Sequence, residues 1–244
     1  MPNKLIDYIK PTIFPDNIIS GVTTKSLDSY PDLGFSINKA EILDDNQTLE
    51  NRKTLAAQIG VSFDKMLFQK QTHSDIIEVK DFDKTPYESD AMMIKESGFV
   101  LNVSIADCAA ILIYDPENKA IAGIHSGWRG TQQNIVEKTI KMMFLKYKTN
   151  PSSVIAYISP AAGGDIYEVG EDVAHFFKIG ITKISAQKYL LDNKFIIQNQ
   201  LLDLGVRQHH IEVSPLCTIS ETKLHSYRRD RDKSGRMSAF IMIK

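Results

Sequence analysis

A series of short apolar runs, separated by polar breaks, constrains the fold of this chain most. The runs are rich in Val, Ile and Phe and are bounded by Asp, Pro, Asn and Gly, which is the pattern of β-strands. A very short break at residues 106–108 and a polar turn at residues 115–119 favour a compact antiparallel or mixed sheet. The predicted strands are Met66–Phe68, Ile76–Val79, Phe99–Ile105, Ala109–Tyr114, Ala120–His125, Val154–Ser159 and Arg236–Ile243.

Three other stretches carry apolar residues at helical spacing. Residues 46–59 are followed by Gly60, a common stop signal for a helix. Residues 132–147 place their large apolar side chains on one face, and residues 167–177 form the third predicted helix. Helices separate some of the predicted strands but not all of them. The predicted fold class is therefore α+β, with mixed β-sheets flanked by helices.

The composition indicates one globular unit. The chain has 244 residues, of which 43% are hydrophobic and 24% charged, so it can bury a sizeable core. We see no repeat, linker composition or low-complexity segment, and we expect residues 1–244 to form a single domain. The formal net charge of -1 excludes a global field that would attract nucleic acid or an anionic membrane.

The cysteine count and the N-terminal segment indicate where the protein works. Cys108 and Cys217 can make at most one disulfide, and reduced thiols fit a chain of this length better. The N-terminal segment has no apolar stretch of signal-peptide length, and no window approaches the ~18 apolar residues of a membrane span. We therefore expect a soluble, cytoplasmic protein.

His73, Cys108 and His125 stand at predicted strand ends or turns in the middle of the chain. If the sheet brings them together, two imidazoles and a thiolate make a ligand set for Zn(II) with a fourth position open. No short ligand spacing such as Cys-x-x-Cys supports a metal. Each residue also has an ordinary explanation: Cys108 as a small buried hydrophobe, His73 as a solvated turn residue and His125 as a core histidine. Both interpretations stay open.

The segment Ser126-Gly-Trp-Arg-Gly-Thr directly precedes the predicted helix over residues 132–147. Gly127 permits close backbone approach, the first N–H groups of a helix are free, and Arg129 supplies a guanidinium. This combination suits an anion such as phosphate. The alternative is that the glycines serve only to make a turn and that Thr131 is only an N-cap.

A second basic cluster, Tyr227-Arg-Arg-Asp-Arg-Asp, interleaves its own counter-charges. We interpret it mainly as internal ion pairing, with Arg228 or Arg229 as a lesser candidate for substrate binding. The remaining histidines have no comparable setting, and we expect them on the surface or in helices. They are His175, His209, His210 and His225.

Several short motifs follow one another in the chain from about Val22 to the C-terminus. They are Gln71-Thr-His-Ser, Ser89-Asp-Ala, Ala106-Asp-Cys, Tyr114-Asp-Pro, His125-Ser-Gly-Trp-Arg-Gly-Thr, Tyr167-Glu-Val-Gly, Ser226-Tyr-Arg-Arg-Asp and Gly235-Arg-Met. In this combination the chain resembles the laccase-domain, YfiH-like family. Its members are described as purine nucleoside phosphorylases and, in some bacteria, as peptidoglycan editing factors. The resemblance implies a single-domain YfiH-like fold of the cysteine-hydrolase type.

The resemblance also implies a metal site of two His and one Cys, at His73, Cys108 and His125. It implies cleavage of the glycosidic bond of adenosine, inosine or methylthioadenosine by phosphate. Adenosine deamination and copper-dependent oxidation of phenols are reported for similar proteins. Two positions depart from the family pattern: Lys25 stands where relatives commonly have Arg, and Ala110 where they commonly have Pro. As a candidate phosphate contact, Lys25 keeps the charge but lacks the bidentate fork of Arg.

The leading hypothesis is a zinc-dependent purine nucleoside phosphorylase in which His73, Cys108 and His125 hold Zn(II) and Arg129 binds phosphate or the ribose side. A second hypothesis makes Cys108 the nucleophile of an amidase that trims wrongly built cell-wall precursors, activated by His125 or His73. A third is a copper-dependent phenol oxidase, although 6 His are too few for a multi-copper enzyme. A non-catalytic metal-binding module is the fourth. The oligomeric state is not predicted.

Overall fold

The computed structural model describes residues 5–30, 34–38, 45–80 and 88–244. Within these residues the strands form three sheets. The first has the order β1 (Tyr8–Ile9), β2 (Ile18–Thr23), β14 (Met237–Ile243), β6 (Val100–Ile105), β3 (Met66–Phe68). The second has the order β13 (Ile211–Val213), β9 (Ile155–Ile158), β7 (Ala109–Asp115), β8 (Ala120–Ser126), β5 (Ala91–Ile94), β4 (Ile77–Val79). The small third sheet has the order β10 (Glu168–Gly170), β12 (Lys188–Leu191), β11 (Ile181–Lys183).

The helices flank these sheets. They are α1 (Asp45–Gln58), α2 (Trp128–Gln132), α3 (Ile135–Tyr147), α4 (Glu171–Ala174), α5 (Asn193–Asp203) and α6 (Tyr227–Asp230). Short 3-10 turns cover Phe63–Lys65, Pro151–Ser153, Gln208–His210 and Arg231–Lys233. None of the helices in the described part of the chain has the length and apolar character needed to cross a membrane.

Both large sheets are mixed. In the first, β3 pairs with β6 in parallel while β14 pairs with β2 and β6 in antiparallel fashion. In the second, β4–β5 and β9–β13 are parallel and the central β7–β8 pair is antiparallel. Together with the flanking helices, this confirms the predicted α+β class with mixed sheets.

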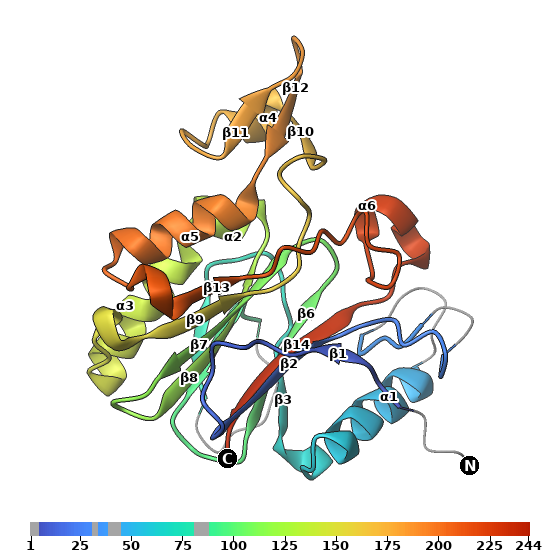
Figure 1. The fold of residues 1–244 in the computed structure, drawn as a ribbon, viewed down its shortest axis with the longest axis vertical. Coiled ribbons are helices and arrows are strands. Elements are labelled where there is room, and N and C mark those ends of the chain that lie inside the picture. The colour runs from blue at the N-terminus through green and yellow to red at the C-terminus, as the bar shows by residue number, and fades with distance from the viewer. Residues whose placement is uncertain (1–4, 31–33, 39–44, 81–87) are drawn as a thin grey trace.

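The core lies in layers around the two large sheets (Figure 1). Their inner faces pack together through buried residues such as Val103 of β6 and Leu112 of β7. Helices α3 and α5 cover the outer face of the second sheet, where Ile140 is part of the buried cluster. Helix α1 covers the outer face of the first sheet, with Leu55 in the same cluster as Phe240. Each sheet is therefore buried on both faces, which explains why its strands are apolar almost throughout.

The predicted strands and the first predicted helix agree with the structure to within one residue at each end. The helix predicted over residues 132–147 is confirmed as α3, which begins at Ile135, and a separate short helix, α2, precedes it. Asn134, between them, has a left-handed backbone (φ 57°), which Asn adopts more readily than most residues. The helix that directly follows Gly127 is therefore only the five residues of α2.

The helix predicted over residues 167–177 is wrong. This segment forms strand β10 followed by the single turn of α4. Val169 pairs with Tyr189 of β12, and both belong to a small apolar cluster beside the third sheet. The pairing partner lies outside any local window, so the helical spacing of the segment is not by itself decisive.

The register of the central strands brings residues of the candidate site to one end of the sheets. Ala109 of β7 pairs with Ser126 of β8, so Cys108 and Gly127 continue side by side beyond the paired strands. The turn from β6 to β7 bends at Asp107, whose left-handed backbone (φ 86°) is unusual for a residue other than glycine.

Candidate active site

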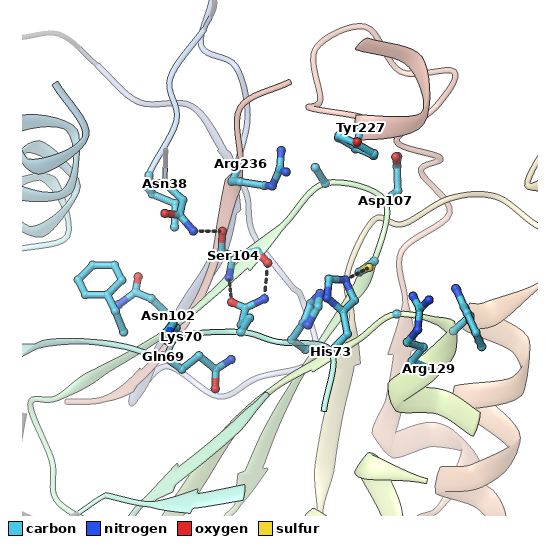
Figure 2. Close-up of a pocket in the computed structure, with 18 of the residues that line it drawn as sticks. Asn38, Gln69, Lys70, His73, Asn102, Ser104, Asp107, Arg129, Tyr227 and Arg236 are labelled. Atoms are coloured by element: carbon cyan, nitrogen blue, oxygen red, sulfur yellow. Dashed lines mark hydrogen bonds between the residues drawn. The ribbon is translucent and has the colours of Figure 1, made fainter. Parts of the chain in front are cut away.

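His73, Cys108 and His125 converge at this end of the sheets. Their ligand atoms all lie within 4.8 Å of one another, and Sγ of Cys108 is 3.8 Å from Nε2 of His73 (Figure 2). In a tetrahedral zinc site, bond lengths of about 2.3 Å to sulfur and about 2.05 Å to nitrogen separate two such ligands by about 3.6 Å. The donor types and their spacing therefore fit a single metal ion.

Asp90, in the turn before β5, organises both histidines. Its buried carboxylate accepts hydrogen bonds from the backbone N–H groups of Thr72, His73 and Ser74 and from the Ser74 hydroxyl. These bonds hold the turn in which His73 has a left-handed backbone (φ 60°). The same carboxylate lies 2.7 Å from Nδ1 of His125. Nδ1 of His125 is thereby the donor, and Nε2 is left free to face the other two side chains.

Asp90 keeps its negative charge at neutral pH in this setting. Burial would raise the pKa of its carboxyl group, but the hydrogen bonds from His125 and Ser74 outweigh burial and hold the pKa well below its usual range. Asp90 is therefore a permanent acceptor at neutral pH. This arrangement favours the Nδ1-protonated form of His125, in which Nε2 carries a free lone pair when the ring is neutral.

Cys108 and His125 shift the pKa of each other. Burial would raise the pKa of the Cys108 thiol, but the charge of His125 and the hydrogen bonds from both histidines lower it to about 6. Burial would lower the pKa of His125, but the Cys108 charge and the Asp90 hydrogen bond raise it to about 9. In the absence of a metal, the pair is a thiolate beside an imidazolium at neutral pH.

Gly127 is packed directly against this cluster. A Cβ atom at this position would lie 2.7 Å from Sγ of Cys108 and 3.4 Å from Cδ2 of His73. The position excludes every larger residue unless Cys108 moves. A residue without a side chain is thus needed here for close packing against Cys108, whereas the sequence predicted close approach of the Gly127 backbone to an anion.

A cavity of about 940 Å³ opens beside the three side chains (Figure 2). Arg129 and Arg228 line it, and each guanidinium stacks on an aromatic ring of the wall, Trp128 at 4.3 Å and Tyr167 at 5.0 Å. The cavity is large enough for a nucleoside-sized ligand. Its wall offers stacking surfaces and positive charge close to the candidate metal ligands.

The predicted binding residues divide into two groups. Gly127, Arg129 and Arg228 line the cavity together with His73, Cys108 and His125. Lys25, Thr131 and Arg229 are not among the residues that line it.

The three outside the lining have partners of their own. Lys25 pairs with Asp230 at 3.2 Å. Thr131 lies buried inside α2, where its hydroxyl bonds to Ser126, so it is not the N-cap. Arg229 donates to several backbone carbonyls and to the Asp230 carboxylate, which confirms internal ion pairing in this basic cluster.

His225 corrects one expectation from the sequence. Whereas His175 and His209 are exposed, His225 is 1% exposed. Its Nε2 lies 2.8 Å from the carbonyl oxygen of Phe35, and its Nδ1 accepts from the N–H of Gly235. Burial lowers the pKa of His225 to about 4, so the ring is neutral at pH 7.

Sequence reasoning assigned no role to Asp90, Asp107 or Arg236. All three lie in motifs that carry the family resemblance, but each role depends on a partner distant in sequence. Asp107 accepts hydrogen bonds from the Thr218 hydroxyl and from the backbone N–H of Arg228, both at 2.6 Å. It thereby fixes the start of α6 above the cavity.

A family model described as multi-copper polyphenol oxidoreductase laccase matches residues 21–244. The chain belongs to this family. The description of the laccase family names copper, and the donor set of His73, Cys108 and His125 is one that copper also accepts. Within the described ranges, however, these three form the one group of three or more clustered His, Cys, Asp or Glu ligands. The geometry therefore supports one metal centre and does not identify the metal.

Relatives in the laccase family carry another name. A protein of Clostridium acetobutylicum named purine nucleoside phosphorylase is 36% identical over 217 residues, covering 87% of this chain and 88% of that protein. Escherichia coli YfiH, also named purine nucleoside phosphorylase, is 32% identical over 202 residues, covering 80% of each chain. The crystal structure of YlmD from Geobacillus stearothermophilus superimposes with a TM-score of 0.88 at 26% identity, over 97% of this chain and 96% of that one.

Proposed function

We propose that this protein is a zinc-dependent purine nucleoside phosphorylase that acts on adenosine, inosine or methylthioadenosine, as a single domain in the cytoplasm. The observation that carries the proposal is the opening of a guanidinium- and aromatic-lined cavity directly beside His73, Cys108 and His125. Relatives named purine nucleoside phosphorylase support the reaction class.

The residues present fit a zinc ion. Two imidazole nitrogens and one thiolate are donors that zinc accepts, and three protein ligands leave a position open, as in catalytic sites. Asp90 holds His125 with Nε2 toward the other donors. When bound, zinc supplies a Lewis acid that polarises an oxygen atom of the substrate. Copper is the alternative metal.

The proposed reaction transfers the ribosyl group from purine to phosphate. An oxygen of phosphate forms the new bond to C1′ of the ribose while the bond from C1′ to the purine nitrogen breaks. The electron pair of the broken bond leaves with the purine, which takes up a proton from water. The protein contributes mainly by positioning the two substrates and by stabilising the separating charges.

We propose roles for four of the residues that line the cavity. Trp128 and Tyr167 present rings for a purine or ribose to pack against, and Arg129 and Arg228 offer N–H donors to phosphate or to ribose hydroxyls. Gly127 lets the backbone pack closely against Cys108 and His73.

The other predicted binding residues lie outside the lining. Lys25 and Arg229 both bind Asp230, at the C-terminal end of α6, and Thr131 ties α2 to Ser126. We propose that these three residues affect substrate binding through the elements they hold. Adenosine deamination in the same cavity is a proposed side activity.

The test is a nucleoside panel with and without inorganic phosphate, run beside elemental analysis of the purified protein. We expect release of free purine that requires phosphate and a stoichiometric metal. Cys108→Ala and His125→Ala variants, shown to be folded by circular dichroism, should lose both metal and turnover. A His175→Ala variant, changed at an exposed histidine, is the matched control. Release of purine at the parent rate by the folded Cys108 and His125 variants would contradict the proposal.

A second candidate function follows from the alignment of Asp90, His125 and Cys108. A carboxylate orients an imidazole, which in turn contacts a thiolate, and this is the arrangement of a cysteine nucleophile with its base. In this alternative the protein is an amidase that edits peptidoglycan precursors, and a bound metal is incidental or inhibitory. Alkylation of Cys108 in metal-free protein should then abolish amidase turnover in step with labelling. Amidase activity that survives complete labelling would exclude the alternative.

A further inference from the structure

Arg236 directly precedes β14, the central strand of the first sheet, and so lies at one end of that sheet. Met237 pairs with Ile105, so Arg236 sits opposite the turn that carries Asp107 and Cys108. The side chain is half-buried, lines the cavity, and Figure 2 shows its guanidinium directed into it. Burial lowers the pKa of Arg236, and the charges of Cys108 and Asp107 act in the opposite direction. The guanidinium is thus a cation in the cavity that His73, Cys108 and His125 also line.

The guanidinium of Arg236 has few partners. Nη1 donates to the carbonyl oxygens of Ser234 and Gly235, at 2.9 and 3.0 Å, and the Tyr227 ring lies 5.6 Å away. Among the described residues, Arg236 makes no ion pair with a carboxylate. Arg229, nearby in sequence, shows the contrast, because it is saturated by carbonyls and by a carboxylate. A half-buried guanidinium without a direct ion pair among the described residues favours binding of an anion.

The backbone that carries Arg236 is fixed before any ligand binds. The N–H of Arg236 donates to the Ser36 hydroxyl at 2.8 Å, and the preceding Gly235 donates to Nδ1 of His225 at 3.1 Å. A Cβ atom on Gly235 would lie 2.7 Å from Cε1 of His225, so only glycine fits. His225 is in turn held by the carbonyl oxygen of Phe35. These contacts orient Arg236 toward the cavity, which reduces the entropic cost of binding a ligand there.

Arg129 is the less suitable contact for phosphate. It is exposed, one face of its guanidinium stacks on Trp128, and the five-residue α2 is too short to offer a helix N-terminus as an anion site. In Figure 2, Arg236 lies above and to the left of His73, and Arg129 lies to its right. A ligand that spans the cavity would therefore meet the two arginines at different places on its wall.

We infer that Arg236 is the principal contact for the phosphate co-substrate, which binds on the side of the cavity formed by the first sheet, while Arg129 lies on the nucleoside side. The inference rests on the proposed function and narrows it. Nε and Nη2 of Arg236 are the donors left for the phosphate oxygens. The positive charge of Arg236 offsets the negative charges of Cys108 and Asp107, which would otherwise repel the anion.

The binding test uses inorganic phosphate alone and the full-length, metal-loaded protein. Isothermal titration is performed on the parent and on Arg236→Gln, Arg236→Lys, Arg129→Gln and Arg207→Gln variants, the last a control at an exposed arginine that does not line the cavity. We expect Arg236→Gln to weaken phosphate binding about tenfold or more, because a charge-assisted hydrogen bond is lost. The Lys variant should fall between the parent and the Gln variant, because it keeps the charge without the fork. The Arg207 variant should stay close to the parent, and Arg129→Gln should weaken phosphate binding less than Arg236→Gln does.

A kinetic readout separates this inference from the proposed function. In the Arg236→Gln variant we expect the KM for phosphate to rise and the KM for nucleoside to stay near the parent value. If the parent releases purine but Arg236→Gln keeps its KM for phosphate, the inference is wrong and the proposed function stands. If phosphate binds through Arg236 but no nucleoside is cleaved, the proposed function is wrong. Absence of phosphate binding to the parent, or its loss in Arg129→Gln but not in Arg236→Gln, overturns the inference. Should Arg236→Gln fail to fold, Arg236→Lys decides: parent-like phosphate affinity would contradict the bidentate contact.

Discussion

The carboxylate of Asp90 lies 2.7 Å from Nδ1 of His125 and at the same time accepts the backbone N–H of His73. One buried side chain therefore orients two of the three candidate metal ligands, one through its ring and the other through its backbone. Such carboxylate–histidine contacts fix the ring and increase the basicity of the nitrogen that faces the metal.

Replacement of Asp90 by Asn should weaken metal binding without removing a ligand. The Asn side chain keeps the shape, but it loses the charge and can present only one oxygen as acceptor. We expect a loss of about 10- to 100-fold in zinc affinity, measured by competition with a chromogenic chelator. Asp75→Asn is the control, because this exposed carboxylate pairs with Lys138 on the surface. Unchanged zinc affinity in folded Asp90→Asn protein would show that Asp90 has no part in the centre.

A methyl group at residue 127 should displace Cys108. In Gly127→Ala the new Cβ would start 2.7 Å from Sγ, so we expect the zinc content to fall and nucleoside turnover to fall with it. Gly130→Ala, also buried, would meet its nearest atom at 3.3 Å and lies away from Cys108. Elemental analysis should show near-parent metal content in Gly130→Ala and reduced metal content in Gly127→Ala. Equal metal content in both variants would rule out close packing at residue 127 as a requirement.

The pH dependence of alkylation of the metal-free protein should show at which pH the Cys108 thiol ionises. With a pKa of about 6, its rate of reaction with iodoacetamide should rise through pH 6 and level off above it, whereas an ordinary thiol responds near pH 8.5. Removal of the neighbouring charge in His125→Ala should move the midpoint upward. A Cys217→Ser background makes Cys108 the one reactive thiol, and His175→Ala serves as the control. A midpoint near pH 8.5 in protein that keeps both Cys108 and His125 would contradict the predicted lowering of the thiol pKa by His125.

The buried His225 should make the fold less stable in acid. Its pKa is about 4 when folded and near 6.5 when unfolded, so the unfolded chain binds the proton more tightly between these values. Stability is therefore full above pH 6.5 and decreases as the pH falls toward 4, by about 3 kcal/mol in total. The free energy of unfolding, measured with urea at several pH values, should decrease less between pH 6.5 and pH 4 in His225→Gln than in the parent. His209→Gln, changed at an exposed site, should keep the parent slope, and equal slopes in all three proteins would refute the assignment.

Local pattern was enough to predict most of the secondary structure. The central strands are buried on both faces, and their continuous apolar runs are bounded by turn residues, so the ends of β6, β7 and β8 follow from the sequence. The segment around Val169 was misassigned because it pairs with a strand that lies twenty residues later in the sequence, where Tyr189 is its partner. Side chains that suit both a helix and a short edge strand cannot decide between them locally.

The sequence indicated three side chains that could share a metal ion, and the structure brings them together, but the residues that orient them were not predictable. Cys108 and His125 are brought together by the pairing of β7 with β8, which a short turn already indicates. The role of Asp90 depends on the approach of the turn at His73, and no spacing rule encodes that approach. The burial of His225 could not be predicted from local sequence either, because its partner Phe35 is separated from it by 190 residues.

X-ray absorption at the zinc edge of the purified, metal-loaded protein tests the metal centre most directly. We predict one sulfur and two imidazole nitrogens around the metal, with the sulfur lost in Cys108→Ala and one nitrogen lost in His73→Ala. A spectrum without sulfur, or one that is unchanged in the folded Cys108→Ala variant, would contradict a shared metal site at His73, Cys108 and His125.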